Sequence, residues 1–207
     1  MTFARAHIAA SVWASQSRNA GFGVRIEGAE IAGLKVITPA KHGDHRGFFS
    51  EVYNRRSFEE AGLRLSFVQD NHSFSAEVGT IRGLHFQSPP FAQDKLVRVT
   101  HGRVLDVAVD LRRSSKTFGR HFAIELSREN WRQLLVPVGF AHGFCTLEPD
   151  TEVLYKVTNY YSAANDFGLA FDDPALGIDW GVDLARARLS EKDRRQSRLA
   201  DLSVVFD

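Results

Sequence analysis

Short strand-like segments separated by turn signals run through most of this chain, and this pattern constrains the fold more than any other feature. The segments that favour strands cover residues 34–38, 48–53, 82–87, 96–100, 103–111, 121–126, 134–136 and 152–158. Polar or glycine-containing turns, such as 44–47, 101–102 and 148–150, lie between them. Many short strands at regular spacing are typical of an antiparallel sandwich or barrel, so we expect an all-β fold.

The clearest strand pattern is the alternation in residues 103–111. Leucine or valine occupies every odd position from 105 to 111, whereas Asp106 and Asp110 fall on the opposite face. Helix signals are few and short. Ser57 and Glu60 have the spacing of a capping box, which predicts a helix to about Leu63. Residues 190–199 predict a charged C-terminal helix capped by Ser190.

The chain has 207 residues, enough for one sizeable domain. No linker or repeat interrupts residues 31–190, so we expect a single domain over 27–207 with a C-terminal helical segment. Residues 1–26 carry three arginines, several serines and no acid, a composition compatible with a transit peptide. We expect them to form a poorly ordered extension, since order is weakest at chain ends.

Composition excludes several classes of protein. The net charge is +1, from 26 basic and 25 acidic residues, which argues against a nucleic-acid-binding protein. Any anionic ligand must therefore be held by local cations. Cys145 is the single cysteine, so no internal disulfide can form, and we expect it to be a small core residue of a cytoplasmic protein. No apolar run approaches the length of a membrane span, so we expect no membrane association.

Residues 82–87 (Arg-Gly-Leu-His-Phe-Gln) place a histidine in a strand-like run next to a glycine. Regular alternation would put Arg82, Leu84 and Phe86 on one face and His85 on the other, with Gln87. A histidine facing a cavity is a candidate proton carrier. The same residue could equally be satisfied by a backbone partner inside a sheet.

A second histidine, His142, lies between glycines in residues 137–144, with the spacing Pro-x-Gly-x-x-His. The two stretches resemble the two signatures of cupin jelly rolls. In metal-binding cupins the first signature supplies His-x-His followed by Glu, but here Gln87 replaces the second histidine, and Phe91 and Ala92 stand where the acid would be. A transition-metal site needs at least three converging ligands, so we expect no metal.

Further motifs follow in the order typical of one enzyme family. They occupy residues 44–51, 67–73, 82–87, 95–98, 106–110, 117–119, 139–144 and 154–161. From about Gly33 to about Arg194 the chain resembles the dTDP-4-dehydrorhamnose 3,5-epimerases, which are metal-free, cupin-type sugar-nucleotide epimerases. The resemblance implies a cupin-type antiparallel jelly roll, or double-stranded β-helix, that works as a homodimer without a cofactor.

The resemblance also implies roles for individual residues. It makes His85 the base, Asp193 the carboxylate that orients it, Tyr155 the acid on the opposite face of the sugar, and Lys95 and Arg82 the cations near the developing oxyanion. Taken alone, each of these residues also fits a structural role. Asp193 could be a helix first-turn acid, Tyr155 a core tyrosine, and Lys95 and Arg82 solvated surface cations.

The family's substrate-binding positions correspond here to Arg46, Glu51, Gln69, Asn71, Arg82, His142, Asp166 and Lys192. Arg46 before a glycine suits a diphosphate because its guanidinium is a forked donor, although it also fits a plain turn arginine. Two departures from the family stand out. Asp166 replaces a glutamate, and Trp180-Gly181 replaces Trp-Pro; we expect both at the periphery of the ligand or the dimer.

The expected function is inversion of C3 and C5 of a dTDP-linked 4-keto-6-deoxyhexose, in the biosynthesis of a deoxysugar such as rhamnose. A mono-epimerase acting at C3 or C5 alone stays open, as does a ketoisomerase on a related nucleotide sugar. The incomplete His-x-His argues against a cupin dioxygenase. A sugar-binding jelly roll with a dead site is the non-enzyme alternative, and the presence of both His85 and Tyr155 argues against it.

Overall fold

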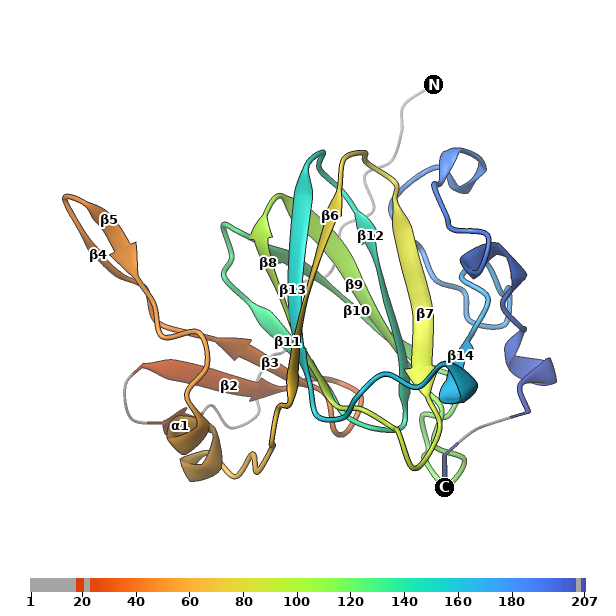
Figure 1. The fold of residues 1–207 in the computed structure, drawn as a ribbon, viewed down its shortest axis with the longest axis horizontal. Coiled ribbons are helices and arrows are strands. Elements are labelled where there is room, and N and C mark those ends of the chain that lie inside the picture. The colour runs from red at the N-terminus through yellow and green to blue at the C-terminus, as the bar shows by residue number, and fades with distance from the viewer. Residues whose placement is uncertain (1–17, 21–22, 204–205) are drawn as a thin grey trace.

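Two antiparallel sheets face each other in the computed structural model, which describes residues 18–20, 23–203 and 206–207 (Figure 1). The seven-stranded sheet consists, in spatial order, of β1 (Arg18–Ala20), β2 (Val24–Gly28), β3 (Lys35–Thr38), β11 (Gln133–Val136), β8 (Lys95–His101), β13 (Thr151–Val157) and β6 (Gln69–Ser75). The five-stranded sheet consists of β10 (His121–Ser127), β9 (Arg103–Asp110), β12 (Phe140–Thr146), β7 (Ile81–Gln87) and β14 (Asp166–Gly168). The expected all-β antiparallel jelly roll is confirmed.

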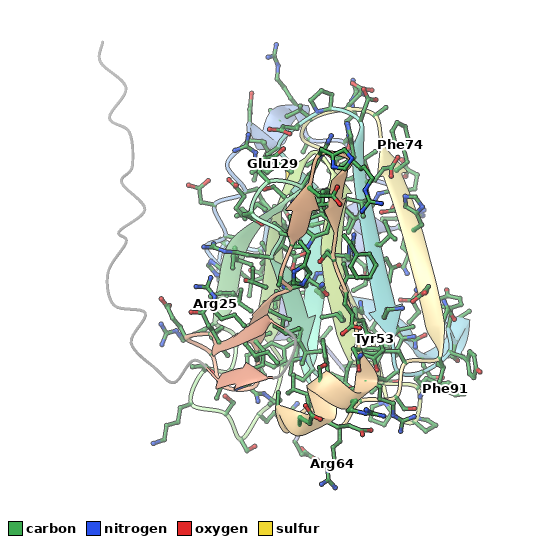
Figure 2. All side chains as sticks on the ribbon, turned by 90° about the vertical axis from the view of Figure 1, so that its left-hand side faces the viewer. Arg25, Tyr53, Arg64, Phe74, Phe91 and Glu129 are labelled. Atoms are coloured by element: carbon green, nitrogen blue, oxygen red, sulfur yellow. The ribbon has the colours of Figure 1, made fainter. Side chains whose placement is uncertain are left out.

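Three apolar clusters hold these layers together. The first lies between the sheets and joins residues such as Val97 of β8 to Val104 of β9. The second covers the outer face of the five-stranded sheet, where the C-terminal segment packs on β7 through Trp180 and its neighbours. The third lies on the outer face of the seven-stranded sheet under helix α1 (Arg55–Glu60), whose Phe58 is fully buried. Figure 2 shows Tyr53 beside this helix.

The alternation predicted for residues 103–111 is confirmed in β9, and both of its faces are buried. Val107 and Val109 face the outer cluster, whereas Val104 and Ala108 face the space between the sheets. Cys145 of β12 is fully buried, as expected, and burial raises the pKa of its thiol to about 11. This thiol is therefore a packing group.

The prediction that Arg82 shares a face of β7 with Leu84 and Phe86 is wrong. In the ladder with β12, His142 pairs with His85 but Phe144 pairs with Arg82, so Gly83 and Leu84 together oppose a single residue. Such a bulge reverses the alternation, and Arg82 points toward β6 while Leu84 and Phe86 pack in the outer cluster. Glycine is needed here, because a Cβ on Gly83 would lie 2.5 Å from the backbone of β12.

Other local predictions need correction. Of residues 48–53, only Phe48 and Phe49 lie in a strand, β5 (Gly47–Phe49), which pairs with β4 (His42–Asp44). Asn54 caps α1 through its side chain, so Ser57 is a buried helical residue and no capping box forms. Residues 190–199 form the short 3-10 turn η3 (Asp193–Arg195), followed by η4 (Leu199–Asp201), in place of an α-helix. Ser190 nevertheless accepts a hydrogen bond from the Asp193 backbone nitrogen.

The predicted boundary between the N-terminal extension and the domain, after residue 26, falls inside β2. Val24 and Ile26 of this strand are buried in the third cluster, and the strand pairs with β3. The single domain therefore includes these residues. Residues 1–17, for which a poorly ordered extension was predicted, lie outside the described residues.

The hairpin of β4 and β5 projects away from the two sheets (Figure 1). Its aromatic side chains are exposed, at 54% for Phe48 and 71% for Phe49. Trp131 lies at its base, edge-on to Phe48, and its indole N–H donates a hydrogen bond to the Ser50 hydroxyl over 2.9 Å. Lys41 lies over the Trp131 ring. We call residues 42–51 the arm.

Candidate active site

A cavity of about 240 Å³ opens where the edges of the two sheets meet. Strands β6, β8 and β13 line it from one sheet and β7 and β14 from the other. Its lining consists of Gln69, Asn71, His85, Phe86, Gln87, Gln93, Lys95, Tyr155, Tyr161, Asp166 and Lys192. Seven of the residues predicted for the site are therefore brought together here, although they come from distant parts of the sequence.

His85 and Asp193 form a hydrogen-bonded pair at this cavity. The His85 Nε2 lies 2.5 Å from an Asp193 carboxylate oxygen. Burial disfavours the charged form of Asp193, but the hydrogen bond and the charge of His85 outweigh burial and lower the pKa of the carboxyl. An ionised acceptor fixes a proton on Nε2 and leaves Nδ1 as the nitrogen that can take up a proton.

The backbone around Asp193 explains how a C-terminal residue reaches β7. Residues after β14 return across the outer face of the five-stranded sheet, where Leu189 packs against the second cluster. The turn at η3 then directs the buried carboxylate of Asp193 back toward His85. The predicted pairing of the two residues is supported by this geometry, although the predicted helix is absent.

Lys95 begins β8 and brings an ammonium group into the cavity. Its Nζ donates to the backbone oxygen of His85 over 3.2 Å. Burial lowers the pKa of Lys95 to about 8, and the negative charges of Asp166 and Asp106 limit that decrease. Lys95 is thus a cation held beside the base, where an oxyanion could be stabilised.

Tyr155 lines the cavity from β13, in the sheet opposite His85. Burial raises the pKa of its phenol, with the charge of Arg82 opposing the rise and that of Asp166 adding to it. A raised pKa keeps the hydroxyl protonated at neutral pH. Tyr155 can therefore donate a proton into the cavity from the side opposite His85.

Polar side chains converge at the cavity mouth. Asp166 accepts a hydrogen bond from the hydroxyl of Tyr161 over 3.0 Å and forms an ion pair with Lys192. Opposite them, Gln69 donates to Asn71 over 2.8 Å on β6. Asp166, predicted as a substrate-binding residue at the periphery of the ligand, thus lines the cavity.

Arg82 and His142 lie next to this cavity. Arg82 donates to the hydroxyl of Ser75 and to the backbone oxygen of Phe74, and with Asp193 it lines a second, more open cavity of about 420 Å³. Figure 2 shows Phe74 and Phe91 at opposite ends of the molecule, and the second cavity lies at the Phe74 end. His142 is buried beside His85 on β12 and does not line the first cavity.

The structure does not bring Arg46 and Glu51 to the cavity. Both lie on the exposed arm, where Arg46 pairs with Asp44. Of Trp180-Gly181, which was predicted at the periphery of the ligand or the dimer, Trp180 is instead fully buried in the second cluster and donates to the Phe171 backbone oxygen over 2.8 Å.

Sequence reasoning did not assign Phe86, Gln87, Gln93 or Tyr161 to the site. Gln87 holds the loop after β13, because it donates to the Tyr160 carbonyl and accepts from the Ser162 nitrogen. Its position in the first cupin signature was the available signal. Gln93 lies outside every motif quoted above, and only the fold brings it here.

The arrangement suits proton transfer to and from a carbon acid. It offers an oriented imidazole, a protonated phenol from the opposite sheet and a buried ammonium, the three functions that formation and reprotonation of an enolate require. Within the described part of the chain, no three His, Cys, Asp or Glu side chains converge as metal ligands would. No helix among the described residues has the length and apolar character needed to cross a bilayer.

Comparisons with known proteins agree with this chemistry. The profile of the family described as dTDP-4-dehydrorhamnose 3,5-epimerase matches residues 28–201. The Sinorhizobium fredii protein of that name is 54% identical over 85% of this chain and 90% of its own length. The crystal structure of a Legionella pneumophila dTDP-6-deoxy-D-glucose-3,5-epimerase in complex with dTDP-4-keto-L-rhamnose is 43% identical, with a TM-score of 0.82 over 86% of this chain and 94% of its own.

A Streptomyces bikiniensis 3'-monoepimerase, solved with dTDP-quinovose, is 32% identical with a TM-score of 0.78, over 83% of this chain and 86% of its own. The fold is therefore shared by double and single epimerases. The match of the family profile over most of the sequence, together with relatives at this level of identity, shows that the chain belongs to the dTDP-4-dehydrorhamnose 3,5-epimerase family.

Proposed function

We propose that the protein inverts both C3 and C5 of a dTDP-linked 4-keto-6-deoxyhexose, converting dTDP-4-dehydro-6-deoxyglucose to dTDP-4-dehydro-L-rhamnose. The observation that carries this proposal is the placement of His85 and Tyr155 on opposite sheets of one cavity, with Lys95 at its wall. Inversion requires this separation, because the proton must leave one face of the carbon and return on the other.

His85 is the proposed base. Its Nδ1 takes the proton from the carbon next to the ketone. The C–H electron pair then forms a double bond from that carbon to C4, and the π pair of the carbonyl moves onto its oxygen to give the enolate. Asp193 orients the imidazole and stabilises its positive charge, as a carboxylate does in hydrolase triads. The Lys95 ammonium stabilises the enolate oxygen, a role that only a charged lysine can fill.

Tyr155 is the proposed acid. Its O–H donates a proton to the opposite face of the enolate carbon, which restores the ketone and leaves the configuration inverted. Exchange with water then returns a proton to Tyr155 and removes one from His85. The same pair can act again at the second carbon, because both protons are activated by the same C4 ketone. No redox or metal step is required.

Double inversion is favoured over single inversion by similarity. The relatives named 3,5-epimerases are 37% to 54% identical to this chain, against 32% for the monoepimerase. Asp166, which replaces the glutamate typical of the family, lies at the mouth with Lys192 and Tyr161. We propose that this cluster, with Gln69 and Asn71, contacts the nucleotide side of the substrate.

We further propose a homodimer in which the arm of one copy completes the cavity of the other. The arm exposes Phe48 and Phe49, and its Arg46 lies apart from the cavity of its own chain. Arg46 and Glu51 would reach the nucleotide of the partner copy. The proposed location is the cytoplasm, since the lone Cys145 needs no oxidising compartment.

Proton NMR in heavy water tests the activity. Wild-type protein is incubated with dTDP-4-dehydro-6-deoxyglucose, and deuterium at each carbon is followed together with ring configuration. We expect deuterium at both C3 and C5 with inversion at both. Exchange at one carbon alone would make the protein a mono-epimerase, and no exchange would make it a binding protein.

Mixed dimers test the arm. Arg46→Ala and His85→Asn homodimers are each expected to be nearly inactive. After the two are mixed and allowed to exchange subunits, half of the protein becomes heterodimer, in which one of the two cavities has both wild-type residues. We expect activity to return to about a quarter of the wild-type value. No recovery, with subunit exchange confirmed by native mass spectrometry, would place Arg46 in the cavity of its own chain or outside both.

A further inference from the structure

Ser190 lies three residues before Asp193, and the mechanism above gives it no role. Its Oγ accepts a hydrogen bond from the Asp193 backbone nitrogen over 3.1 Å. The spacing Ser-x-x-Asp is close to that of a capping box, in which the acid reaches back to the backbone N–H of the serine. Here the Asp193 carboxylate turns to His85 instead. The turn therefore leaves this carboxylate free to bind the base.

The Ser190 side chain also contacts the carboxylate of Asp193. A hydroxyl that accepts one hydrogen bond still has a hydrogen to donate, and an ionised carboxylate can only accept. Burial opposes the ionisation of Asp193, whereas the hydrogen bonds from His85 and from the Ser190 side chain lower the pKa of its carboxyl. Ser190 thus holds Asp193 at two points, the backbone nitrogen and the side chain.

The His85–Asp193 pair lies between the two cavities. His85 lines the first cavity, whereas Asp193 and Ser190 line the second. Ser190 is exposed there, so a hydrogen-bonded row runs from the second cavity through its hydroxyl and the carboxylate to the imidazole. Asp193 is therefore supported from the side away from the cavity in which the sugar is proposed to bind. A change at Ser190 leaves the lining of that first cavity intact.

The backbone near Asp193 is anchored only at a distance from it. One isolated β-bridge holds the chain at Arg188, before the turn, and another holds it at Ser197, after the turn. Within the described structure, the backbone of residues 189–196 makes backbone hydrogen bonds only to itself. The direction of the Asp193 side chain therefore depends on side-chain contacts, and Ser190 supplies two of them.

We propose that Ser190 is a positioning residue for the proton transfer: its hydroxyl accepts from the Asp193 backbone, donates to the Asp193 carboxylate, and so keeps that carboxylate aimed at the Nε2 of His85. The inference rests on the proposed role of His85 as the base. Without the hydroxyl, the carboxylate is free to turn toward the second cavity. The imidazole then carries its proton on Nε2 less often, and its Nδ1 is less available as the base.

Three substitutions of Ser190 in the intact enzyme separate capping from orientation. Ser190→Ala removes both hydrogen bonds. Its kcat should fall about tenfold, as for the loss of a hydrogen bond to a charged group, with KM within about threefold of the wild type. Ser190→Asp keeps a good cap but cannot donate to a second carboxylate, so it should keep most of its thermal stability and still lose about tenfold or more in kcat. Ser190→Thr keeps the hydroxyl and should stay within about twofold of the wild type.

Ser115→Ala is the matched control. The Ser115 hydroxyl likewise accepts from a backbone nitrogen, that of Thr117, over 3.1 Å, and donates to a buried carboxylate, that of Asp110, over 2.7 Å. These residues line neither cavity, so the control should lose stability but keep kcat. Wild-type kcat in Ser190→Ala, or an equal fall in Ser190→Ala and Ser115→Ala, would overturn the proposal. Wild-type kcat in Ser190→Asp would also overturn it, because Ser190 would then be a cap alone.

Nitrogen-15 NMR of the histidine-labelled protein tests the inference without substrate. The His85 signal is the one missing from His85→Asn. In the wild type this histidine should carry its proton on Nε2, where the hydrogen bond to Asp193 slows exchange with water. Exchange should be about tenfold faster in Ser190→Ala and unchanged in Ser115→Ala. Equal exchange rates in all of these proteins would contradict the inference, whether or not the protein is an epimerase. The expected difference in exchange, found in a protein without turnover, would support the positioning role and count against the proposed function alone.

Discussion

The Nε2 of His85 lies 2.5 Å from a carboxylate oxygen of Asp193, although the two residues are 108 positions apart in the chain. The C-terminal segment therefore takes part in the site as well as covering the five-stranded sheet. Because the carboxylate is buried and ionised, it holds the imidazole in one orientation and one tautomer.

Replacing His85 by asparagine should abolish exchange at both sugar carbons. Asparagine keeps much of the size and polarity of histidine but cannot take up a proton at neutral pH. Loss of a general base typically costs about 100- to 10,000-fold in rate. Exchange is measured by proton NMR in heavy water, with His121→Asn as the control, because His121 bonds to the backbone of Leu176 away from the cavity. Near-normal exchange in His85→Asn would remove this residue from the mechanism.

Asp193→Asn should affect rate much more than binding. The amide can present a donor to Nε2, which would leave the imidazole in the wrong tautomer. We expect kcat to fall on the order of 100-fold or more, while KM stays within about threefold. The control is Asp183→Asn, which changes a capping carboxylate on the same segment. Steady-state kinetics on both variants would separate the loss of His85 orientation from a general effect of removing a carboxylate there. Equal kinetics in both variants would contradict the orienting role.

Activity should fall as pH rises through about 8, where Lys95 loses its proton. The sign follows from the role: the ammonium form stabilises the enolate and the neutral amine does not. In Lys95→Arg the basic limb of the pH profile of activity should move to higher pH, because a guanidinium stays charged. Lys156→Arg, which changes a surface lysine paired with Asp70, should keep the limb near 8. If the basic limb stays near pH 8 in Lys95→Arg, the loss of activity at high pH comes from the titration of a group other than Lys95.

Exhaustive chelation should leave the turnover rate unchanged. The expectation rests on the donor set, since the cupin signature at His85 lacks its second histidine and its acid. Turnover is measured before and after dialysis against a chelator, together with elemental analysis. Activity that is lost on dialysis and restored by one metal ion would show that the metal-free account is wrong.

Much of this fold was accessible from periodicity. The alternation of β9 placed Val107 and Asp106 on opposite faces correctly, because a strand buried on both sides still keeps its period of two. Strand β12, which contains Gly143 and directly follows Gly139, was not predicted as a strand, since glycine is depleted in strands. At β7 the bulge opposite Gly143 moved Arg82 to the other face, which no local pattern reveals.

The site was accessible mainly through the resemblance. Asp193 has no local feature that distinguishes it from other acids near a turn, and only the return of the C-terminal segment brings it to His85. Asp106 belonged to a quoted motif, but its pairing with His142 depends on the order of β9 and β12 in the sheet. Arg46 shows the converse: a family position that one copy of the fold does not bring to its own cavity.

The central claim is that two groups on opposite sheets exchange protons with opposite faces of the sugar, and Tyr155→Phe tests it most directly. Phenylalanine keeps the ring packing and removes only the hydroxyl, so stability should barely change. His85 can still form the enolate and return deuterium from its own side. In heavy water, proton NMR should therefore show deuterium entering at C5 with retained configuration. Unchanged epimerisation by this variant would contradict the claim and make Tyr155 a packing residue.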